Sequence, residues 1–336
     1  MWLIIGDLHL TDRPQDAYRF GIFDWIKKQQ AKDKPAATFL LGDITDSKDR
    51  HSATLVNQIV SGLVSLKPPV YVLKGNHDYS DPKNPFFKFL NHIDGLKFVI
   101  KPTVIKAIKP VALIPHYRSQ DDFDNAVRST SGNGVPACFL VHQTFEGAIA
   151  ESGVRLSGLS ASLIESMKPP LGVYAGDVHK PQTQGLVTYV GCPYHVRFGD
   201  DFEPRCIEIS QSGVEAYPWF DAPRKWSLTV RGPENILNNK NLLEGDQVKL
   251  TIELAREESV EWQQVKQEVL AACKKLKLEV YGARVEVRTV ARHDRIKVDK
   301  VGTPSETLDT FCRAEKVASQ VKKTGMEILG GDKNSL

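Results

Sequence analysis

Residues 42–46 read GDITD and residues 75–78 read GNHD, and each stretch closely follows a short apolar run. These runs, at residues 38–41 and 70–73, are bounded by glycine in the way that is typical of buried strands. Three further runs, at residues 2–5, 137–141 and 172–174, lead into Gly6-Asp7, His142 and Gly176-Asp177. The sequence therefore predicts five buried strands whose ends carry polar residues.

Helical patterns separate the first three of these strands. Residues 16–30 place apolar side chains on one helical face, and residues 52–66 do the same behind Ser52, a predicted N-cap. Strands that alternate with helices indicate βαβ units and an α/β fold with substantial parallel pairing. Ligands bind outside the carboxyl ends of strands in such sheets, so the polar run ends are predicted to form a site.

The composition shifts near residues 218–225, where prolines and aromatic residues interrupt the pattern. We predict a catalytic domain over residues 1–222 and a small α+β domain over 223–292. Within the second, residues 226–230, 247–254 and 278–290 are predicted strands and 260–276 a helix. Residues 293–336 are predicted to be a polar linker and a last helix, over 305–329, that ends at Gly330-Gly331.

The bulk composition excludes several classes of protein. With 41% apolar and 25% charged residues the chain can form a core, and a net charge of +3 neither requires nor excludes a nucleic-acid partner. Its five widely spaced cysteines form no CxxC pair, which argues against a zinc ribbon and a disulfide framework. The first apolar run is too short for a signal peptide or a membrane span, so we expect a cytoplasmic protein without membrane contact.

The polar residues at the run ends are all of metal-ligating or proton-transferring type: Asp7, His9, Asp43, Asn76, His77, Asp78, His142, Asp177 and His179. Taken singly, each motif also fits an ordinary role, such as a strand-end turn, a helix cap or a structural histidine. Five such signals at five strand ends favour a common site. Carboxylate, amide and imidazole groups without thiolate suit hard or borderline divalent ions, and there are enough for two ions with a shared carboxylate.

In this order the motifs resemble the signature of the calcineurin-like metallophosphoesterases. The tract that follows them, with KPQ at 180–182, YVGCPY at 189–194 and FGD at 198–200, resembles that of SbcD-type DNA double-strand-break repair nuclease subunits, including tailed-phage recombination endonuclease subunits. The likeness is one of motifs over residues 1–205 and one of architecture beyond. It implies a metallophosphoesterase β-sandwich flanked by helices, a small α+β capping domain and a C-terminal partner-binding helix.

The resemblance also implies roles for single residues. A first metal would be bound by Asp7, His9, Asp43 and His179, and a second by Asn76, His142 and Asp177 together with the bridging Asp43. His77, oriented by Asp78, would stabilise the transition state and protonate the leaving oxygen. The ions would be manganese, and the reaction would be 3′-to-5′ exonuclease cleavage of duplex ends and endonuclease cleavage of single strands or hairpins.

One residue departs from the family pattern, because Asp177 stands where the family has histidine. A carboxylate can still bind a metal, and it favours harder ions such as manganese or magnesium. It also adds negative charge beside an incoming phosphate. An inactivating replacement is the alternative explanation.

The C-terminal third suggests partners. The last predicted helix carries an apolar stripe, which fits either packing on its own domain or docking onto another protein. The resemblance implies that this partner is the coiled-coil root of an SbcC-like ATPase, and that the chain is a homodimer acting on DNA. A basic stretch at residues 284–300 fits a solvated edge at least as well as a phosphate contact.

Three functions therefore remain open: a DNA nuclease subunit, a phosphodiesterase of small nucleotides, and a metallophosphoesterase scaffold without catalysis. The extra domain and terminal helix argue against a small substrate. Intact Asn76, His77 and Asp78 argue against a scaffold.

Overall fold

The computed structural model describes residues 1–106, 109–132, 134–210, 213–219, 221–255, 260–287, 304–314 and 321–324. By its internal contacts the chain divides into two compact units, Met1–Ile252 with Gln263–Val285, and Glu253–Trp262 with Glu286–Leu336. The predicted boundaries at residues 222 and 292 remain predictions.

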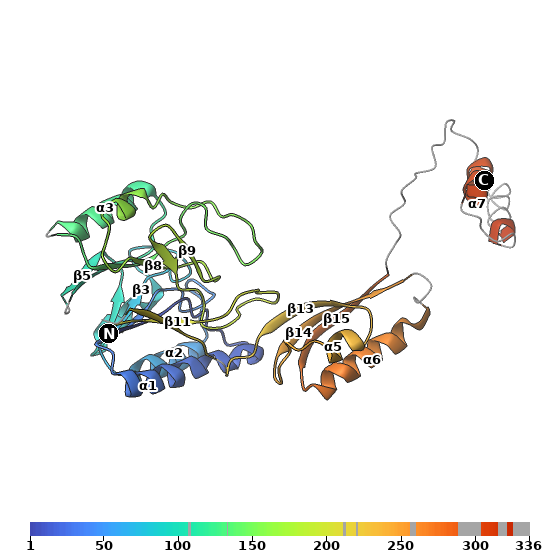
Figure 1. The fold of residues 1–336 in the computed structure, drawn as a ribbon, viewed down its shortest axis with the longest axis horizontal. Coiled ribbons are helices and arrows are strands. Elements are labelled where there is room, and N and C mark those ends of the chain that lie inside the picture. Colours follow the sequence, from blue (N-terminus) through green and yellow to red (C-terminus); the bar gives the residue numbers. More distant parts are fainter. Residues whose placement is uncertain are drawn as a thin grey trace. The chain divides into compact units, whose positions relative to one another are not determined.

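Two six-stranded mixed sheets dominate the first unit (Figure 1). In spatial order the first contains β12 (Val214–Tyr217), β11 (Cys206–Ile209), β1 (Trp2–Ile5), β2 (Ala37–Leu40), β3 (Val70–Leu73) and β4 (Leu96–Val99). The second contains β5 (Thr103–Lys106), β6 (Pro110–Ile114), β7 (Cys138–His142), β8 (Val173–Gly176), β10 (Val187–Tyr189) and β9 (Gln182–Gln184). The central strands β1 to β4, and likewise β6, β7, β8 and β10, pair in parallel. Their carboxyl ends therefore meet along one edge of each sheet.

Helices cover the outer face of each sheet. These elements are η1 (Pro14–Phe20), α1 (Gly21–Asp33), α2 (Ala53–Val64), η2 (Phe86–His92), α3 (Gln120–Ser131) and α4 (Ser162–Ser166). Figure 1 shows α1 and α2 on one side of the stacked sheets and α3 on the other. Ser52 caps α2 as predicted, since its side chain accepts a hydrogen bond from the backbone N–H of Leu55.

Three hydrophobic clusters follow from this layering. Trp2 and Ile4 of β1 lie in the cluster between the sheets, whereas Leu3 and Ile5 of the same strand pack under α1 and α2. A third cluster packs α3 and α4 on the second sheet. Because both faces of β1, β2 and β7 are buried, these strands are largely apolar, which is why they are recognisable in the sequence.

A smaller sheet follows, formed by β13 (Lys225–Val230), β14 (Gln247–Leu254) and β15 (Glu279–Val287), with α5 (Glu234–Leu237) and α6 (Trp262–Lys275) between the strands. These elements form the predicted α+β arrangement: each predicted strand and helix begins within a few residues of its predicted start, whereas α5 was not predicted. The last helix begins as predicted, as α7 (Pro304–Ala314), and residues 321–324 are also helical. The remainder of the predicted helix, the end of the predicted strand 278–290 and most of the basic stretch lie outside the described residues.

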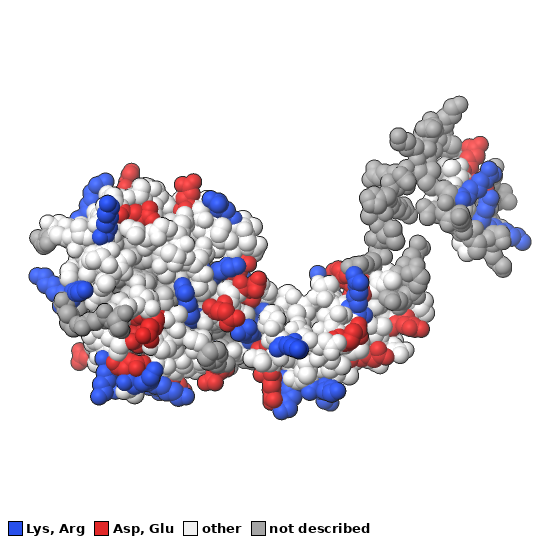
Figure 2. All heavy atoms as spheres, in the orientation of Figure 1, with Lys and Arg blue, Asp and Glu red and all other residues white. Residues whose placement is uncertain are grey.

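Surface charge is mixed rather than concentrated. Figure 2 shows Lys and Arg interspersed with Asp and Glu over the visible face of the described residues. Among the described residues, the structure has no helix that is both long and apolar enough to cross a bilayer.

Candidate metal centre

The predicted ligands gather where the parallel strands end. Asp7 and His9 follow β1, Asp43 follows β2, Asn76 follows β3, His142 ends β7, and Asp177 and His179 follow β8. The sheets thus contribute from both sides to one buried cluster, in which Asp7, Asp43 and His142 are at most 1% exposed. Hydrogen bonds from the amides of Leu8 and His9 to the carbonyl of Asp43 tie the first two loops together.

Glycine permits this close approach. A Cβ on Gly42 would lie 2.5 Å from Nδ1 of His142, and one on Gly75 would lie 2.2 Å from Oδ1 of Asp43. The glycine before each polar residue is therefore a steric requirement of the site, and it explains the repeated Gly-Asp and Gly-Asn pairs in the sequence.

Three predicted ligands have a left-handed backbone, which costs free energy in a residue other than glycine. The φ angles are 42° at His9, 48° at Asp43 and 84° at Asp177. Strain of this kind persists where the surrounding structure over-determines the backbone, and it concentrates at functional sites. The strain favours a function for these three positions, including Asp177, the residue that differs from the family pattern.

Each histidine of the cluster has its Nδ1 atom beside an oxygen. Nδ1 of His142 lies 2.6 Å from the carbonyl oxygen of Leu41, and Nδ1 of His9 lies 2.8 Å from Oδ1 of Asp46. Nδ1 of His179 lies 3.1 Å from Oε1 of Glu151. An acceptor at Nδ1 fixes the tautomer and leaves Nε2 as the metal-binding atom.

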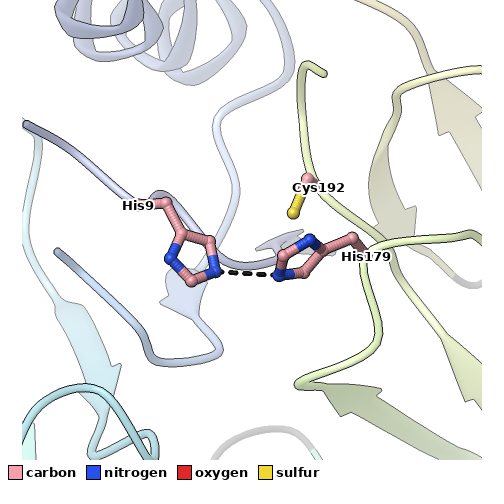
Figure 3. A group of neighbouring side chains, drawn as sticks. All are labelled: His9, His179 and Cys192. Atoms are coloured by element: carbon pink, nitrogen blue, oxygen red, sulfur yellow. Dashed lines mark hydrogen bonds between the residues drawn. The ribbon is translucent and has the colours of Figure 1, made fainter. Parts of the chain in front are cut away.

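The Nε2 atoms converge on the shared carboxylate. Those of His9 and His179 are 2.9 Å apart (Figure 3), and Nε2 of His9 lies 3.8 Å from Oδ2 of Asp43. The other oxygen of Asp43 lies 3.5 Å from Nε2 of His142, which in turn is 3.7 Å from Oδ1 of Asp177. Asp43 therefore lies between two groups of ligand atoms, as a bridging carboxylate must.

Several buried side-chain atoms of the described residues have no hydrogen-bond partner, and two of them, Oδ1 of Asn76 and Nε2 of His142, belong to the predicted second metal site. Buried polar atoms are normally satisfied, and a divalent cation would satisfy an amide oxygen and an imidazole nitrogen together. The residues present thus fit two divalent ions.

Carboxylates give the cluster an excess of negative charge. Burial raises the pKa of Asp43 well above its usual value. Burial alone would lower the pKa of His142, but Asp43, Asp7 and Asp177 outweigh it and raise this pKa to about 9. Burial, with a smaller effect of His179, lowers the pKa of His9 to about 4 despite nearby Asp46, so this ring is neutral at physiological pH.

Asp78 has a different role from the one that the resemblance implied. Its oxygens accept hydrogen bonds from the amides of Gly75 at 2.7 Å, Asp43 at 2.9 Å and Ile44 at 3.0 Å. Nδ1 of His77 instead lies 3.0 Å from the carbonyl oxygen of Asp46. The His77 ring is therefore oriented by Asp46, and Asp78 joins the loops after β2 and β3.

Asp177 is held at both ends. Its backbone N–H donates to the carboxylate of Asp7 at 3.0 Å, and the hydroxyl of Thr144 donates to its Oδ2 at 2.6 Å. Its other oxygen remains directed toward His142. Thr144 was not predicted from the sequence, because it lies in an irregular loop without any motif.

Two further residues beside the site were also missed. Glu151 lies in the same loop as Thr144, where neither spacing nor residue type indicates a role. The buried sulfur of Cys192 lies beside His9 and His179 (Figure 3), and all three ligand atoms fall within 4.8 Å of one another. Burial raises the pKa of Cys192 well above its usual value, so the free thiol predicted here stays protonated.

The comparisons with known proteins agree with this geometry. Residues 2–142 match the family model described as calcineurin-like phosphoesterase. The chain contains a calcineurin-like phosphoesterase domain. The chain is also similar to exonuclease subunit 1 of Enterobacteria phage T4, with 22% identity over 242 residues, which are 69% of this chain and 70% of that protein. This aligned length exceeds the calcineurin-like phosphoesterase match, so the likeness to the phage protein extends beyond residues 2–142.

Proposed function

We propose that the chain is a manganese-dependent DNA nuclease subunit. Its activities would be a 3′-to-5′ exonuclease on duplex ends and an endonuclease on single strands or hairpins. Phosphodiester cleavage is supported mainly by one observation, the convergence of histidine Nε2 atoms and buried carboxylates around Asp43. The choice of DNA is supported by the similarity to a phage exonuclease subunit over 242 residues.

The proposed chemistry assigns a task to each group. Asp7, His9, Asp43 and His179 would hold the first ion, and Asp43, Asn76, His142 and Asp177 the second. When bound, such ions supply positive charge that polarises the phosphate and favours ionisation of an attacking water. A donor set rich in oxygen and imidazole suits manganese.

His77 is placed to transfer a proton. Its ring lines the cavity and packs edge-on against His9, with centroids 5.3 Å apart. Because Nδ1 faces the Asp46 carbonyl, Nε2 is the atom available to protonate the leaving oxygen. The His77 amide donates to Oδ1 of Asp43 at 2.8 Å, which couples the ring position to the shared ligand.

The proposed partners are DNA, a second copy of the chain and an SbcC-like coiled-coil ATPase. The word "subunit" in the name of the phage protein supports an assembly. The α7 helix is a candidate docking element because it is amphipathic, with Phe311 36% exposed.

The test is cleavage of end-labelled duplex and single-stranded DNA in manganese, magnesium or EDTA, with a His77→Ala control. Manganese-dependent shortening that both EDTA and the substitution abolish is the expected result. Cleavage of small nucleotide diesters but not of DNA would favour the small-nucleotide alternative. Two bound ions per chain without cleavage would favour a scaffold or a subunit that needs the ATPase, and adding an SbcC-like partner separates those two.

A further inference from the structure

The cavity that contains the metal-ligating residues reaches residues outside the phosphoesterase motifs. It has a volume of about 1010 Å³, and its lining includes His77 and Asp177 as well as Phe198, Lys249 and Tyr281. This volume is at the upper limit of small-ligand sites, which span roughly 300–1,000 Å³. The cavity therefore has room for more than the phosphodiester group at the metal centre.

A rigid turn presents Phe198 to this cavity. The buried carboxylate of Asp200 accepts hydrogen bonds from the amides of Val196 at 2.8 Å and Arg197 at 2.9 Å. The amide of Gly199, whose φ is 91°, donates to the carbonyl of Lys225 at 3.0 Å, which joins the turn to β13. The position of the aromatic ring is thus fixed by the backbone on both sides.

Tyr281 of β15 lies against this ring. The two ring centroids are 5.7 Å apart with an interplanar angle of 48°, and Tyr281 is 38% exposed. Its hydroxyl donates to Glu279 at 3.0 Å and accepts from Gln247 at 3.4 Å. Tyr281 therefore has part of its aromatic side chain exposed, while Phe198 packs against its ring.

The charge beside the aromatic pair is positive. Nζ of Lys249 lies 4.5 Å from the centroid of Phe198, and the side chain is exposed without an ion pair to any described residue. Nζ of Lys225 is 5.5 Å from the same centroid, but Asp16 neutralises it through an ion pair of 2.5 Å. Lys249 is accordingly a cation beside the aromatic pair that can bind an added anion.

We infer that Tyr281, Phe198 and Lys249 form a subsite for an unpaired nucleotide next to the scissile phosphate. The base stacks on Tyr281, and a neighbouring phosphate contacts Lys249. Within a duplex each internal base is stacked on both faces, whereas an unpaired, unstacked base exposes a face to an aromatic side chain, so the subsite favours a single-stranded segment over an intact duplex. This inference rests on the proposed function, since it assumes that the metal centre acts on a polynucleotide.

The experiment compares two oligonucleotides of equal length, oligothymidylate and its abasic counterpart, by fluorescence anisotropy with manganese. The His77→Ala background prevents hydrolysis during the titration. Tyr281→Leu should weaken binding of oligothymidylate by about 5- to 150-fold and leave the abasic strand unaffected. Tyr281→Phe keeps the ring and should bind like the parent. Phe89→Leu, at a residue of similar exposure outside the cavity, is the matched control.

Lys249→Gln tests the phosphate contact. It should weaken binding of both strands and reduce the slope of log affinity against log salt by about 0.7, as expected for one lost phosphate contact on a single strand. Lys97→Gln removes an exposed lysine of β4, outside the cavity, and should change neither the affinity nor the slope. A Lys249→Gln variant with the parent's salt slope would remove Lys249 from the subsite.

Two failures are distinguishable. If the wild-type chain cleaves labelled DNA and Tyr281→Leu binds both strands as the parent does, or weakens both equally, the subsite is wrong and the nuclease proposal stands. If the wild-type chain neither cleaves nor binds DNA, the proposed function fails and the subsite fails with it.

Discussion

Removing the charge of Glu151 should weaken one metal site and leave the other unchanged. Glu151 binds neither ion in the proposed scheme, but its Oε1 lies 3.1 Å from Nδ1 of His179, a buried residue that we propose as a ligand. The contact with His179 is the main reason why the pKa of Glu151 is lowered to about 2, so this carboxylate is ionised at physiological pH. It therefore fixes the ring and makes Nε2 a better electron donor.

The expected loss of metal affinity can be taken from comparable metal sites in other proteins. Loss of a carboxylate that orients a ligating histidine costs about 10- to 100-fold in metal affinity, or roughly 1.4–2.7 kcal/mol. Glu151→Gln keeps an acceptor oxygen and should fall near the lower value. Glu151→Ala removes the acceptor and should fall near the upper one. The melting temperature of each variant is the control for a general loss of stability.

The assay is a titration of the metal-free chain with manganese, followed by the electron paramagnetic resonance signal of the free ion. Two sites should be resolved in the wild-type chain, and one should weaken in each variant. Glu146→Gln is the matched control, since Glu146 is exposed and lies in the same loop. Unchanged affinity in both Glu151 variants, or an equal loss in Glu146→Gln, would refute the positioning role.

Three further predictions follow from buried contacts. Asp16→Asn should cost about 3–5 kcal/mol of unfolding free energy in urea, because it leaves Lys225 buried without its partner. Burial raises the pKa of Asp16, but Arg19 and Lys225 outweigh this effect and lower the pKa. The stabilisation by ionised Asp16 is therefore complete above about pH 4. The difference in unfolding free energy between variant and wild type should vanish as the pH falls through the lowered pKa. Asp78→Ala should cost about 1.5–3 kcal/mol for each of its three amide contacts, measured in the same way, and a loss below 1.5 kcal/mol in total would contradict its structural role. Thr144→Val should lower manganese affinity at the second site by about tenfold through loss of the contact to Asp177, with the melting temperature as control.

Much of the fold was predictable because the central strands are buried on both faces. β1, β3 and β14 have the predicted bounds, and the bounds of β2, β7, β8 and β13 differ from the prediction by one or two residues. Helix 16–30 was less well predicted, since residues 14–20 form the turn η1 before α1 begins at Gly21. Pro14 fixes its own φ and favours the start of a helical segment, whereas the amphipathic pattern alone cannot separate a 3₁₀ turn from an α-helix.

The site was predictable where a ligand follows a strand, and unpredictable where its partner lies in a loop. Asp7, Asp43 and His142, which the structure brings into one buried cluster, were predicted as ligands because strand ends mark them. Glu151 and Thr144 contact the cluster from the irregular connection after β7. The spacing of apolar residues in the sequence does not predict such a contact. The partners of Asp78 were missed for the same reason, because its three amide donors come from two separate loops.

The departure at Asp177 is better explained as an altered ligand than as a decayed one. A residue released from selection for metal binding has no reason to retain a backbone φ of 84°, and glycine would relieve that strain. The carboxylate instead receives a hydroxyl from Thr144 on one oxygen and keeps the other 3.7 Å from Nε2 of His142. A histidine in its place would offer one neutral nitrogen, whereas Asp177 offers a charged oxygen. If Asp177 binds the second ion as proposed, that site is harder, and its preference should move toward manganese and magnesium over zinc. If Asp177→His leaves the ratio of manganese to zinc affinity unchanged in competition titrations, this explanation is wrong.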